Sequence, residues 1–305
     1  MRIVFMGTPG FAVASLERLY ADGHEIVGVF TNPDKPRNRG MRLGFSSVKE
    51  TAMEHGIQVH QPDSLTGGAA TETIRDLKCD IVAVVAYGKL LPRDILDLPP
   101  MGCINIHASL LPKYRGAAPI QWAIINGETE TGVTSMLISE KLDAGDVFLS
   151  KKTPIGAGET AGELSNRLSL MGAELLNETI AAISSGKALR TPQDHGAASY
   201  APALKKEDSF IDWSDTALNI ERKVRGLNPK PGARAEFGGA DYKIFSVEIG
   251  DPKPASMEPG EVYHGVQRGL GVACADAIVT ITELQAPGGK RMAASEFLKG
   301  NRIWG

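Results

Sequence analysis

The sequence predicts an α/β protein with a mainly parallel sheet covered by helices on both faces, followed by a small C-terminal β-barrel. Three observations favour this fold class. Strand-like and helix-like segments alternate through the first 150 residues, which is typical of β-α-β units. Residues 80–87 (DIVAVVAY) are apolar almost throughout, as expected of a strand buried on both faces. After residue 205, short alternating runs between glycines and prolines predict a barrel.

The first part of the chain, 1–188, is therefore predicted to form a Rossmann-like domain. Each predicted strand is a short apolar run, and the predicted helices have apolar residues three or four apart. The last helix begins with Thr160 and Glu163 at the spacing of a capping box and ends at Gly186. We predict strands over 2–6, 25–30, 80–87, 102–107 and 133–138, and helices over 12–21, 47–55, 116–126 and 159–185.

Residues 189–205 have no clear period and contain two prolines and several small residues, which is typical of a linker. The second domain, 206–305, is predicted to be an OB-like β-barrel preceded by a helix over 215–225. Its predicted strands are 233–237, 242–249, 260–266, 271–274 and 278–284.

The 305 residues carry a net charge of −3, so any contact with nucleic acid must come from a local patch. The three cysteines lie far apart in apolar runs, which is typical of buried thiols in a reducing compartment. The first residues resemble a strand rather than a signal peptide, and no apolar run reaches the roughly 20 residues that span a bilayer. We expect a monomeric, cytoplasmic protein with no membrane partner.

The most informative segment is 103–116, CINIHASLLPKYRG. Alternation along a strand puts Asn105 and His107 on one face, at the carboxyl end where open α/β sheets bind ligands. The loop that follows contains Pro112, which fixes φ, and Gly116, which allows an unusual turn. Taken alone, the pair favours a buried histidine bonded to backbone. The whole run followed by Asp143 favours a reactive site.

Asp143 lies in a second turn-forming run, LDAGD (142–146). An aspartate near glycine is often a turn residue, and spacing alone does not separate Asp143 from Asp146. Cys103 shares the face of Asn105 and His107, but a cysteine inside a strand is usually a small core residue. The remaining histidines have no ligand spacing with a second histidine or cysteine, so we expect no metal.

These residues resemble those of the folate-dependent formyltransferases. The resemblance rests on Asn105, His107, the run 109–124 (SLLPKYRGAAPIQWAI) and Asp143, and it extends from 5–12 (FMGTPGFA) to the C-terminus. It implies that a formyl group passes from 10-formyltetrahydrofolate to an amine. Over the whole length it implies that the acceptor is the amino group of methionine on initiator methionyl-tRNA.

The resemblance also implies roles for individual residues. Asn105 would donate a hydrogen bond to the developing oxyanion, His107 would carry a proton, and Asp143 would orient the imidazole or a water. A flat pterin needs an apolar slot with backbone donors and acceptors. The resemblance places it against Ser109, Leu110, Leu111, Pro112, Tyr87, Gly88 and Leu90.

A basic loop over 31–49 is the best candidate for RNA contact in the first domain. Its cations outnumber its acids, and its prolines and glycines predict an irregular loop at the rim that also carries His107. A run of charges is usually a solvated face, and from this segment alone both interpretations are equally good. The resemblance favours tRNA contact. The candidate residues are Lys35, Arg37, Arg39 and Arg42.

Other functions stay open at this point. The same chemistry could act on a small amine, such as a glycinamide ribonucleotide or an amino sugar, but a small substrate needs neither the barrel nor the basic loop. A hydrolase could release formate from the same folate. A non-catalytic RNA-binding protein would not need Asn105, His107 and Asp143. The barrel has 13 lysines and arginines against 14 aspartates and glutamates, so its own charge does not decide the matter.

Overall fold

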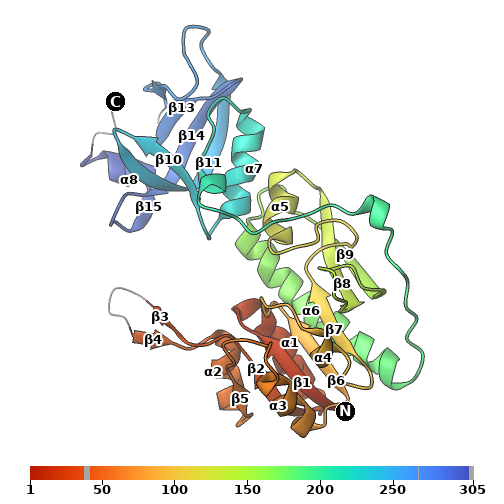
Figure 1. Cartoon of the computed structure of the whole chain (residues 1–305). Coiled ribbons are helices and arrows are strands. Elements are labelled where there is room, and N and C mark those ends of the chain that lie inside the picture. Colours follow the sequence, from red (N-terminus) through yellow and green to blue (C-terminus); the bar gives the residue numbers. More distant parts are fainter. Residues whose placement is uncertain (38–41, 267, 302–305) are drawn as a thin grey trace. The chain divides into compact units, whose positions relative to one another are not determined.

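The computed structural model describes residues 1–37, 42–266 and 268–301, and Figure 1 shows its helices and strands. The chain divides into two compact units. The first consists of Met1–Pro119, Glu130–Pro154 and Ser165–Pro202, and the second of Ile120–Thr129, Ile155–Leu164 and Ala203–Gly305. None of the helices in the described residues has the length and hydropathy that a membrane crossing requires.

The first unit is built on a seven-stranded sheet in the order β5-β2-β1-β6-β7-β8-β9. The first five of these strands are parallel, whereas β8 is antiparallel to β7 and β9 is antiparallel to β8. This sheet confirms the predicted mainly parallel, Rossmann-like fold. The strands are β1 (Arg2–Gly7), β2 (Glu25–Phe30), β5 (Val59–His60), β6 (Ile81–Val85), β7 (Cys103–His107), β8 (Glu130–Leu137) and β9 (Val147–Pro154).

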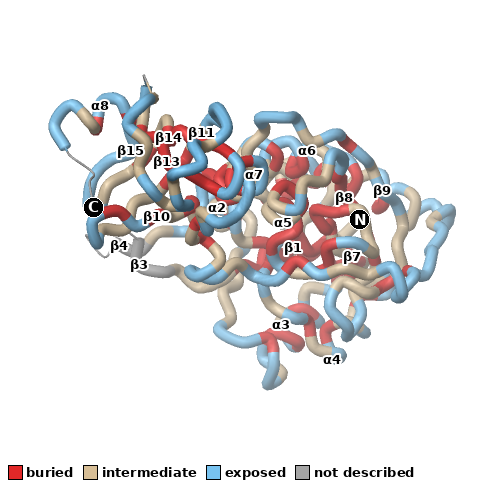
Figure 2. Tube along the Cα trace, turned by 90° about the horizontal axis from the view of Figure 1, so that it is seen from above, coloured by how far each residue is buried: buried red, intermediate tan, exposed pale blue. Residues whose placement is uncertain are grey.

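Helices cover both faces of this sheet, and β1 is buried along most of its length (Figure 2). On one face, Cys103 packs in a hydrophobic cluster with Ile74 of α3 (Ala69–Leu77) and Ile95 of α4 (Arg93–Leu96). On the other, α6 comes so close that a Cβ at Gly172 would lie 2.9 Å from Ile106 Cγ2. The first unit also contains α1 (Val13–Ala21), α2 (Ser47–Glu54), most of α6 (Ala161–Ser184) and a 3-10 turn at Gly10–Ala12. All of α5 (Pro119–Ile125) except its first residue belongs to the second unit.

The elements that the sequence predicts match the structure to within three residues at each end. The predicted capping box is present, because the Glu163 carboxylate accepts from Thr160 N at 2.9 Å and Thr160 Oγ1 accepts from Glu163 N at 3.3 Å. Besides the hairpin of residues 35–44 and the 3-10 turns, four elements of the first unit were not predicted. They are α3, α4, β5 and β9, of which β5 is two residues long and β9 is an edge strand with two lysines.

The basic segment that the sequence predicts to be irregular contains a two-stranded hairpin. β3 (Lys35–Arg37) pairs antiparallel with β4 (Arg42–Gly44), and Arg37 lies opposite Arg42 in the register. The interpretation of the segment as an irregular loop is therefore wrong for these six residues. Residues 38–41 lie outside the described residues.

The second unit is built on an antiparallel sheet in the order β10-β11-β14-β13-β12, with β15 pairing with β14. Residues Ile220 and Val224 of α7 pack against Val279 and Ile281 of β14 in a second hydrophobic cluster. This curled sheet confirms the predicted OB-like domain. The elements are α7 (Ala217–Leu227), β10 (Ala233–Phe237), β11 (Ala240–Pro252), β12 (Val262–Tyr263), β13 (Leu270–Ala273), β14 (Ala277–Gln285), β15 (Arg291–Ala293) and α8 (Ala294–Leu298), with a 3-10 turn at Glu207–Ser209.

Much of the segment expected to be a linker is bonded to the first unit. Thr191 exchanges two backbone hydrogen bonds of 2.9 Å with Val147. Arg115 N donates to Ser199 O at 2.8 Å, and Ala201 N donates to Arg115 O at 2.7 Å. A 3-10 turn, His195–Ala197, lies between these two attachments. The division into 1–188, 189–205 and 206–305 stays a prediction.

Candidate active site

His107 ends β7 and is held by a backbone carbonyl. Its Nε2 lies 2.8 Å from Tyr114 O, and a carbonyl can only accept, so Nε2 carries the hydrogen. Nδ1 is therefore the ring nitrogen that can exchange a proton. It faces Asp143 Oδ2 at 3.6 Å, which is longer than a hydrogen bond. The two side chains are only 7% and 12% exposed, so water screens this pair weakly.

Asp143 reaches His107 by an indirect path. Because β8 is antiparallel to β7, Leu137 lies opposite Ile104, and Ile138 N donates to Cys103 O. The loop after β8 thus starts at the amino end of β7 and folds back to bring Asp143 to the carboxyl end. Asp143 has a φ of +46°, a left-handed backbone that aspartate tolerates better than most residues.

Two glycines make this return loop fit. Gly116 N donates to Asp143 Oδ2 at 2.7 Å, which fixes the carboxylate. Gly116 has a φ of +122°, and a Cβ there would lie 2.6 Å from Ala201 O. A Cβ at Gly145 would lie 1.8 Å from Leu137 O, so only glycine fits.

Asn105 lies on the same strand and face as His107, two residues earlier. It pairs with Val84 of β6 and Met136 of β8 in the sheet and is half-buried. Within the described part of the chain, its side-chain amide forms no hydrogen bond to the protein. The amide can therefore donate to a ligand oxygen.

The loop after His107 is fixed by a buried hydroxyl. Thr134 Oγ1 donates to Ser109 O at 2.7 Å and accepts from Leu111 N at 3.2 Å. Ser109 Oγ donates to Lys113 O at 2.6 Å, so its hydroxyl supports the loop. Leu110, Leu111 and Pro112 are half-buried.

The residues expected to hold folate from the β6 side lie in different environments. The Tyr87 side chain is only 2% exposed and packs in the hydrophobic core, where burial raises the pKa of its phenol to about 12. Gly88 is exposed with a φ of +82°, and Leu90 is 72% exposed. Tyr87 O accepts from Asn32 Nδ2 at 2.9 Å. The Leu90 side chain is therefore accessible to a ligand, whereas the Tyr87 side chain is not.

Four residues support the site through hydrogen bonds that the sequence did not indicate. Tyr114 supplies the carbonyl for His107, and Gly116 supplies the amide for Asp143. Arg115 and Gln193 join the loops of the site. The unusual turn predicted at Gly116 is present, with a positive φ at Tyr114 (+59°) and at Gly116 (+122°). The partners of these residues lie far away in the sequence, and a single sequence does not show them.

Cys103 lies in the hydrophobic core. Burial raises the pKa of the Cys103 thiol to about 12, so it is inert at neutral pH. Within residues 1–37, 42–266 and 268–301, no three histidine, cysteine, aspartate or glutamate side chains come together in a way that could hold a metal ion.

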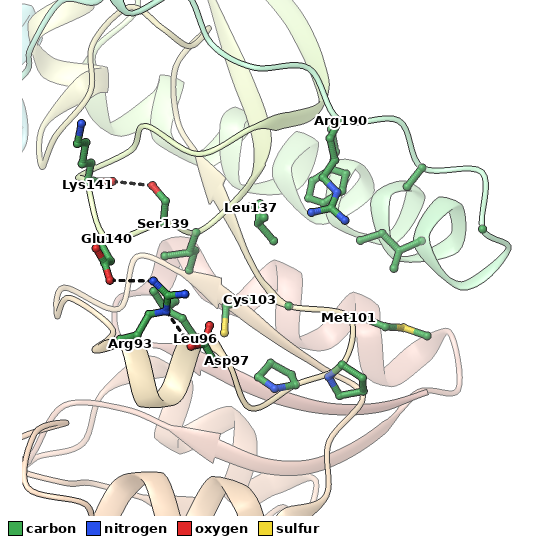
Figure 3. Close-up of a pocket in the computed structure, with 18 residues that line it drawn as sticks. Arg93, Leu96, Asp97, Met101, Cys103, Leu137, Ser139, Glu140, Lys141 and Arg190 are labelled. Atoms are coloured by element: carbon green, nitrogen blue, oxygen red, sulfur yellow. Dashed lines mark hydrogen bonds and ion pairs between the residues drawn. The ribbon is translucent and has the colours of Figure 1, made fainter.

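A cavity of about 810 Å³ lies in the first unit at the amino end of β7 (Figure 3). Its lining includes Gly102, Leu137 and Arg190, and Arg93 bonds Glu140 at one side of it. None of Asn105, His107 and Asp143 lines it. We place the candidate active site at the carboxyl end of β7, where the reactive side chains lie, because the volume of a cavity alone does not indicate reactivity.

Three of the four candidate tRNA residues lie on the hairpin. Lys35 and Arg37 belong to β3 and Arg42 to β4. Arg39 lies outside the described residues.

Comparison with known proteins agrees with this fold. The formyl transferase model matches residues 1–180, and the formyl transferase C-terminal domain model matches residues 203–302. This combination of domains is that of a formyl transferase enzyme.

The chain is 46% identical over 302 residues to the methionyl-tRNA formyltransferase of Trichlorobacter lovleyi, covering 99% of this chain and 95% of the relative. It is 44% identical to that of Ruminiclostridium cellulolyticum, covering 99% and 97%. The chain therefore belongs to the methionyl-tRNA formyltransferase family.

A solved structure, HypX from Aquifex aeolicus in complex with tetrahydrofolic acid, has the same fold. It matches with a TM-score of 0.65 at 21% identity, covering 98% of this chain and 48% of that one. The chain thus spans about half the length of that protein.

Proposed function

We propose that this protein transfers the formyl group of 10-formyltetrahydrofolate to the amino group of methionine on initiator methionyl-tRNA. One observation carries the chemistry: His107 turns its proton-exchanging Nδ1 toward Asp143 on the same sheet face as the Asn105 amide. The names of relatives at 44–46% identity favour methionyl-tRNA over a small amine as the acceptor.

The residues divide the reaction among them. 10-Formyltetrahydrofolate supplies the formyl group that the amine attacks. The Asn105 amide donates to the oxygen that becomes charged in the tetrahedral intermediate. His107 Nδ1 takes the proton that the amine loses and returns it to the folate nitrogen that leaves. Asp143 stabilises the imidazolium between these two transfers. The products are formylmethionyl-tRNA and tetrahydrofolate.

We propose that folate contacts Leu110, Leu111, Pro112, Gly88 and Leu90, which are partly or fully exposed and follow the carboxyl ends of β7 and β6. The Tyr87 and Ser109 side chains are buried, so we assign them to support of the folate site rather than to contact with folate. Substitution of Leu90 by Asp, which puts a charge on an exposed apolar surface, should raise the KM for folate and leave the KM for tRNA unchanged.

The function is tested by offering one formyl donor to several acceptors. The purified protein is incubated with 10-formyltetrahydrofolate and, in separate reactions, initiator methionyl-tRNA, free methionine, a glycinamide ribonucleotide, an amino sugar nucleotide, or no acceptor. We expect formylation of the tRNA alone. Formylation of a small amine instead, or formate release without an acceptor, would contradict the proposal. His107→Gln should abolish transfer. His55→Gln, a partly exposed histidine paired with Glu17 on another part of the first unit, should not.

For tRNA binding we propose the β3–β4 hairpin with Lys35, Arg37, Arg39 and Arg42, together with the second unit. Removing a cation that binds a phosphate should weaken the salt dependence of tRNA binding. Lys35→Ala with Arg37→Ala should therefore raise the KM for tRNA and flatten its dependence on salt. Arg75→Ala removes a positive charge from α3 and serves as the control. If tRNA binding by the wild type, the double variant and Arg75→Ala depends equally on salt, the hairpin does not contact the tRNA.

We further propose that the protein works as a cytoplasmic monomer, since its proposed substrate, charged initiator tRNA, is used in the cytoplasm. Light scattering of the free protein and of its complex with tRNA measures the oligomeric state. A stable dimer at assay concentrations would contradict this part of the proposal.

A further inference from the structure

Residues 191–201, which we name the strap, are bonded to both loops of the active site. Near its start, the strap pairs with Val147, just after the loop that carries Asp143. Near its end, it pairs with the loop that carries Tyr114 and Gly116, where Ser199 Oγ accepts from Tyr114 N at 2.9 Å. One strap side chain, Gln193, connects the two loops directly.

Gln193 is only 9% exposed and uses both ends of its amide. Its Nε2 donates to Asp143 O at 3.0 Å and to Gly145 O at 2.7 Å. Its Oε1 accepts from Arg115 Nε at 3.2 Å and from Arg115 Nη2 at 2.6 Å. Carbonyls only accept and a guanidinium only donates, so these partners fix the orientation of the amide.

Arg115 is a buried cation that belongs to the same connection. The residue is 4% exposed, and within the described residues its guanidinium contacts no carboxylate. Besides Gln193, its side chain bonds His195 Nδ1 at 3.1 Å. A buried charge needs hydrogen-bonded partners, so Arg115 holds Gln193 in one orientation. Gln193 in turn presents its two hydrogens to the Asp143 loop.

We propose that Gln193, locked by Arg115, is a positioning residue that sets the distance between Asp143 and His107. This inference rests on the proposed function. Both ends of the return loop lie at the amino end of β7, so the strand does not fix how far the loop reaches toward His107. The hydrogen bond to Asp143 O acts on the backbone of the residue whose carboxylate must face Nδ1. No atom of Gln193 need touch either substrate.

The substitution Gln193→Glu tests whether Gln193 positions Asp143 or only stabilises the fold. Glutamate has the same shape and keeps an acceptor for Arg115, but it replaces the donor with an oxygen that faces two carbonyl oxygens. A displacement of about 1 Å at a reacting group can cost roughly 100-fold in rate. We therefore expect kcat to fall about 100-fold while the KM values for folate and tRNA change less than twofold. Gln285→Glu, which alters an amide that bonds Gly289 O in the second unit, is the matched control and should keep wild-type kcat.

A second comparison asks whether Gln193 acts through Asp143. In an Asp143→Ala background, Gln193→Glu should cause no further loss of kcat, because the group that it positions is absent. If Gln193→Glu does not fold, the double variant Arg115→Met with Gln193→Met replaces the buried polar pair by apolar side chains of similar size. It should show the same loss of kcat. Thermal unfolding monitors the fold of each variant.

The outcomes are distinguishable. Failure of the wild-type protein to formylate any acceptor would overturn the proposed function and this inference with it. An active wild type with unchanged kcat in Gln193→Glu would overturn only this inference. So would a loss that appears in KM rather than in kcat, or one that persists undiminished in the Asp143→Ala background.

Discussion

Replacement of Asp143 by asparagine removes one negative charge beside His107 with almost no change in shape. The asparagine oxygen can still accept from Gly116 N, which lies 2.7 Å from Asp143 Oδ2. The loop should therefore keep its place. What disappears is the attraction between the carboxylate and the charged imidazole that forms when Nδ1 takes a proton.

The magnitude of this loss follows from the distance of 3.6 Å between Asp143 Oδ2 and His107 Nδ1. For two unit charges at this separation, the attraction is about 1 kcal/mol in bulk water and about 4.6 kcal/mol at an effective dielectric constant of 20. Both side chains are mostly buried, so the value should lie toward the upper limit. Each 1.36 kcal/mol is tenfold in rate, so we expect kcat to fall by roughly 10-fold to 1,000-fold.

The assay compares kcat at saturating formyl donor and methionyl-tRNA, with formylated and unformylated tRNA separated after quenching. Asp146→Asn is the matched control, because Asp146 lies in the same LDAGD run and its side chain makes no contact with His107 among the described residues. Asp143→Asn with kcat within twofold of the wild type would refute the electrostatic role. An equal loss in Asp146→Asn would assign the effect to the loop rather than to the charge.

Three further predictions concern the support of the site and the core. Gly116→Ala places a Cβ 2.6 Å from Ala201 O at a φ of +122°. It should lower the free energy of unfolding in urea by roughly 1–3 kcal/mol. An equal loss in Gly158→Ala, where the added Cβ meets nothing within 4 Å, would contradict this. Cys103 should resist thiol reagents at pH 7 in the native protein and react in urea, and rapid native modification would disprove its burial. Burial lowers the pKa of His60 below 6.5, so its contribution to stability is complete above about pH 6.5 and is lost as the pH falls toward the lowered value. His60→Phe should flatten this acid loss, and identical acid curves would contradict the shift.

The sequence predicts those elements best whose apolar pattern is strong and local. β10 has the predicted limits, Ala233–Phe237, and the apolar run of β6 is buried at every position. α3 was missed because its sequence, AATETIRDL, has only two large apolar residues. β9 was missed because an edge strand with Lys151 and Lys152 needs no continuous apolar run.

Within the site, the sequence predicts the side-chain positions that depend on alternation along one strand. It does not predict contacts between residues that lie far apart in the chain. Asn105 and His107 share a face because they are two residues apart on one strand, and the register bears this out. The distance from His107 to Asp143 depends on β8 being antiparallel, which the alternating pattern did not indicate. Gln193 acts through hydrogen bonds to residues 50 and 78 positions away, and such bonds leave no local pattern.

The antiparallel β8 has a consequence for how the site is held. In a parallel arrangement, a strand would deliver its carboxylate directly at the edge that carries His107. Here the loop after β8 returns across the strand, and its Asp143 carries a left-handed backbone that aspartate adopts at a cost of roughly 1–3 kcal/mol. That cost must be offset by contacts that exist only when the loop is in place. The structure shows three such hydrogen bonds. Gly116 N donates to the Asp143 carboxylate, and the Gln193 amide donates to the backbone carbonyls of Asp143 and Gly145. All three come from residues 108–118 and the strap, so both of these segments hold the Asp143 loop in the conformation that brings its carboxylate toward His107.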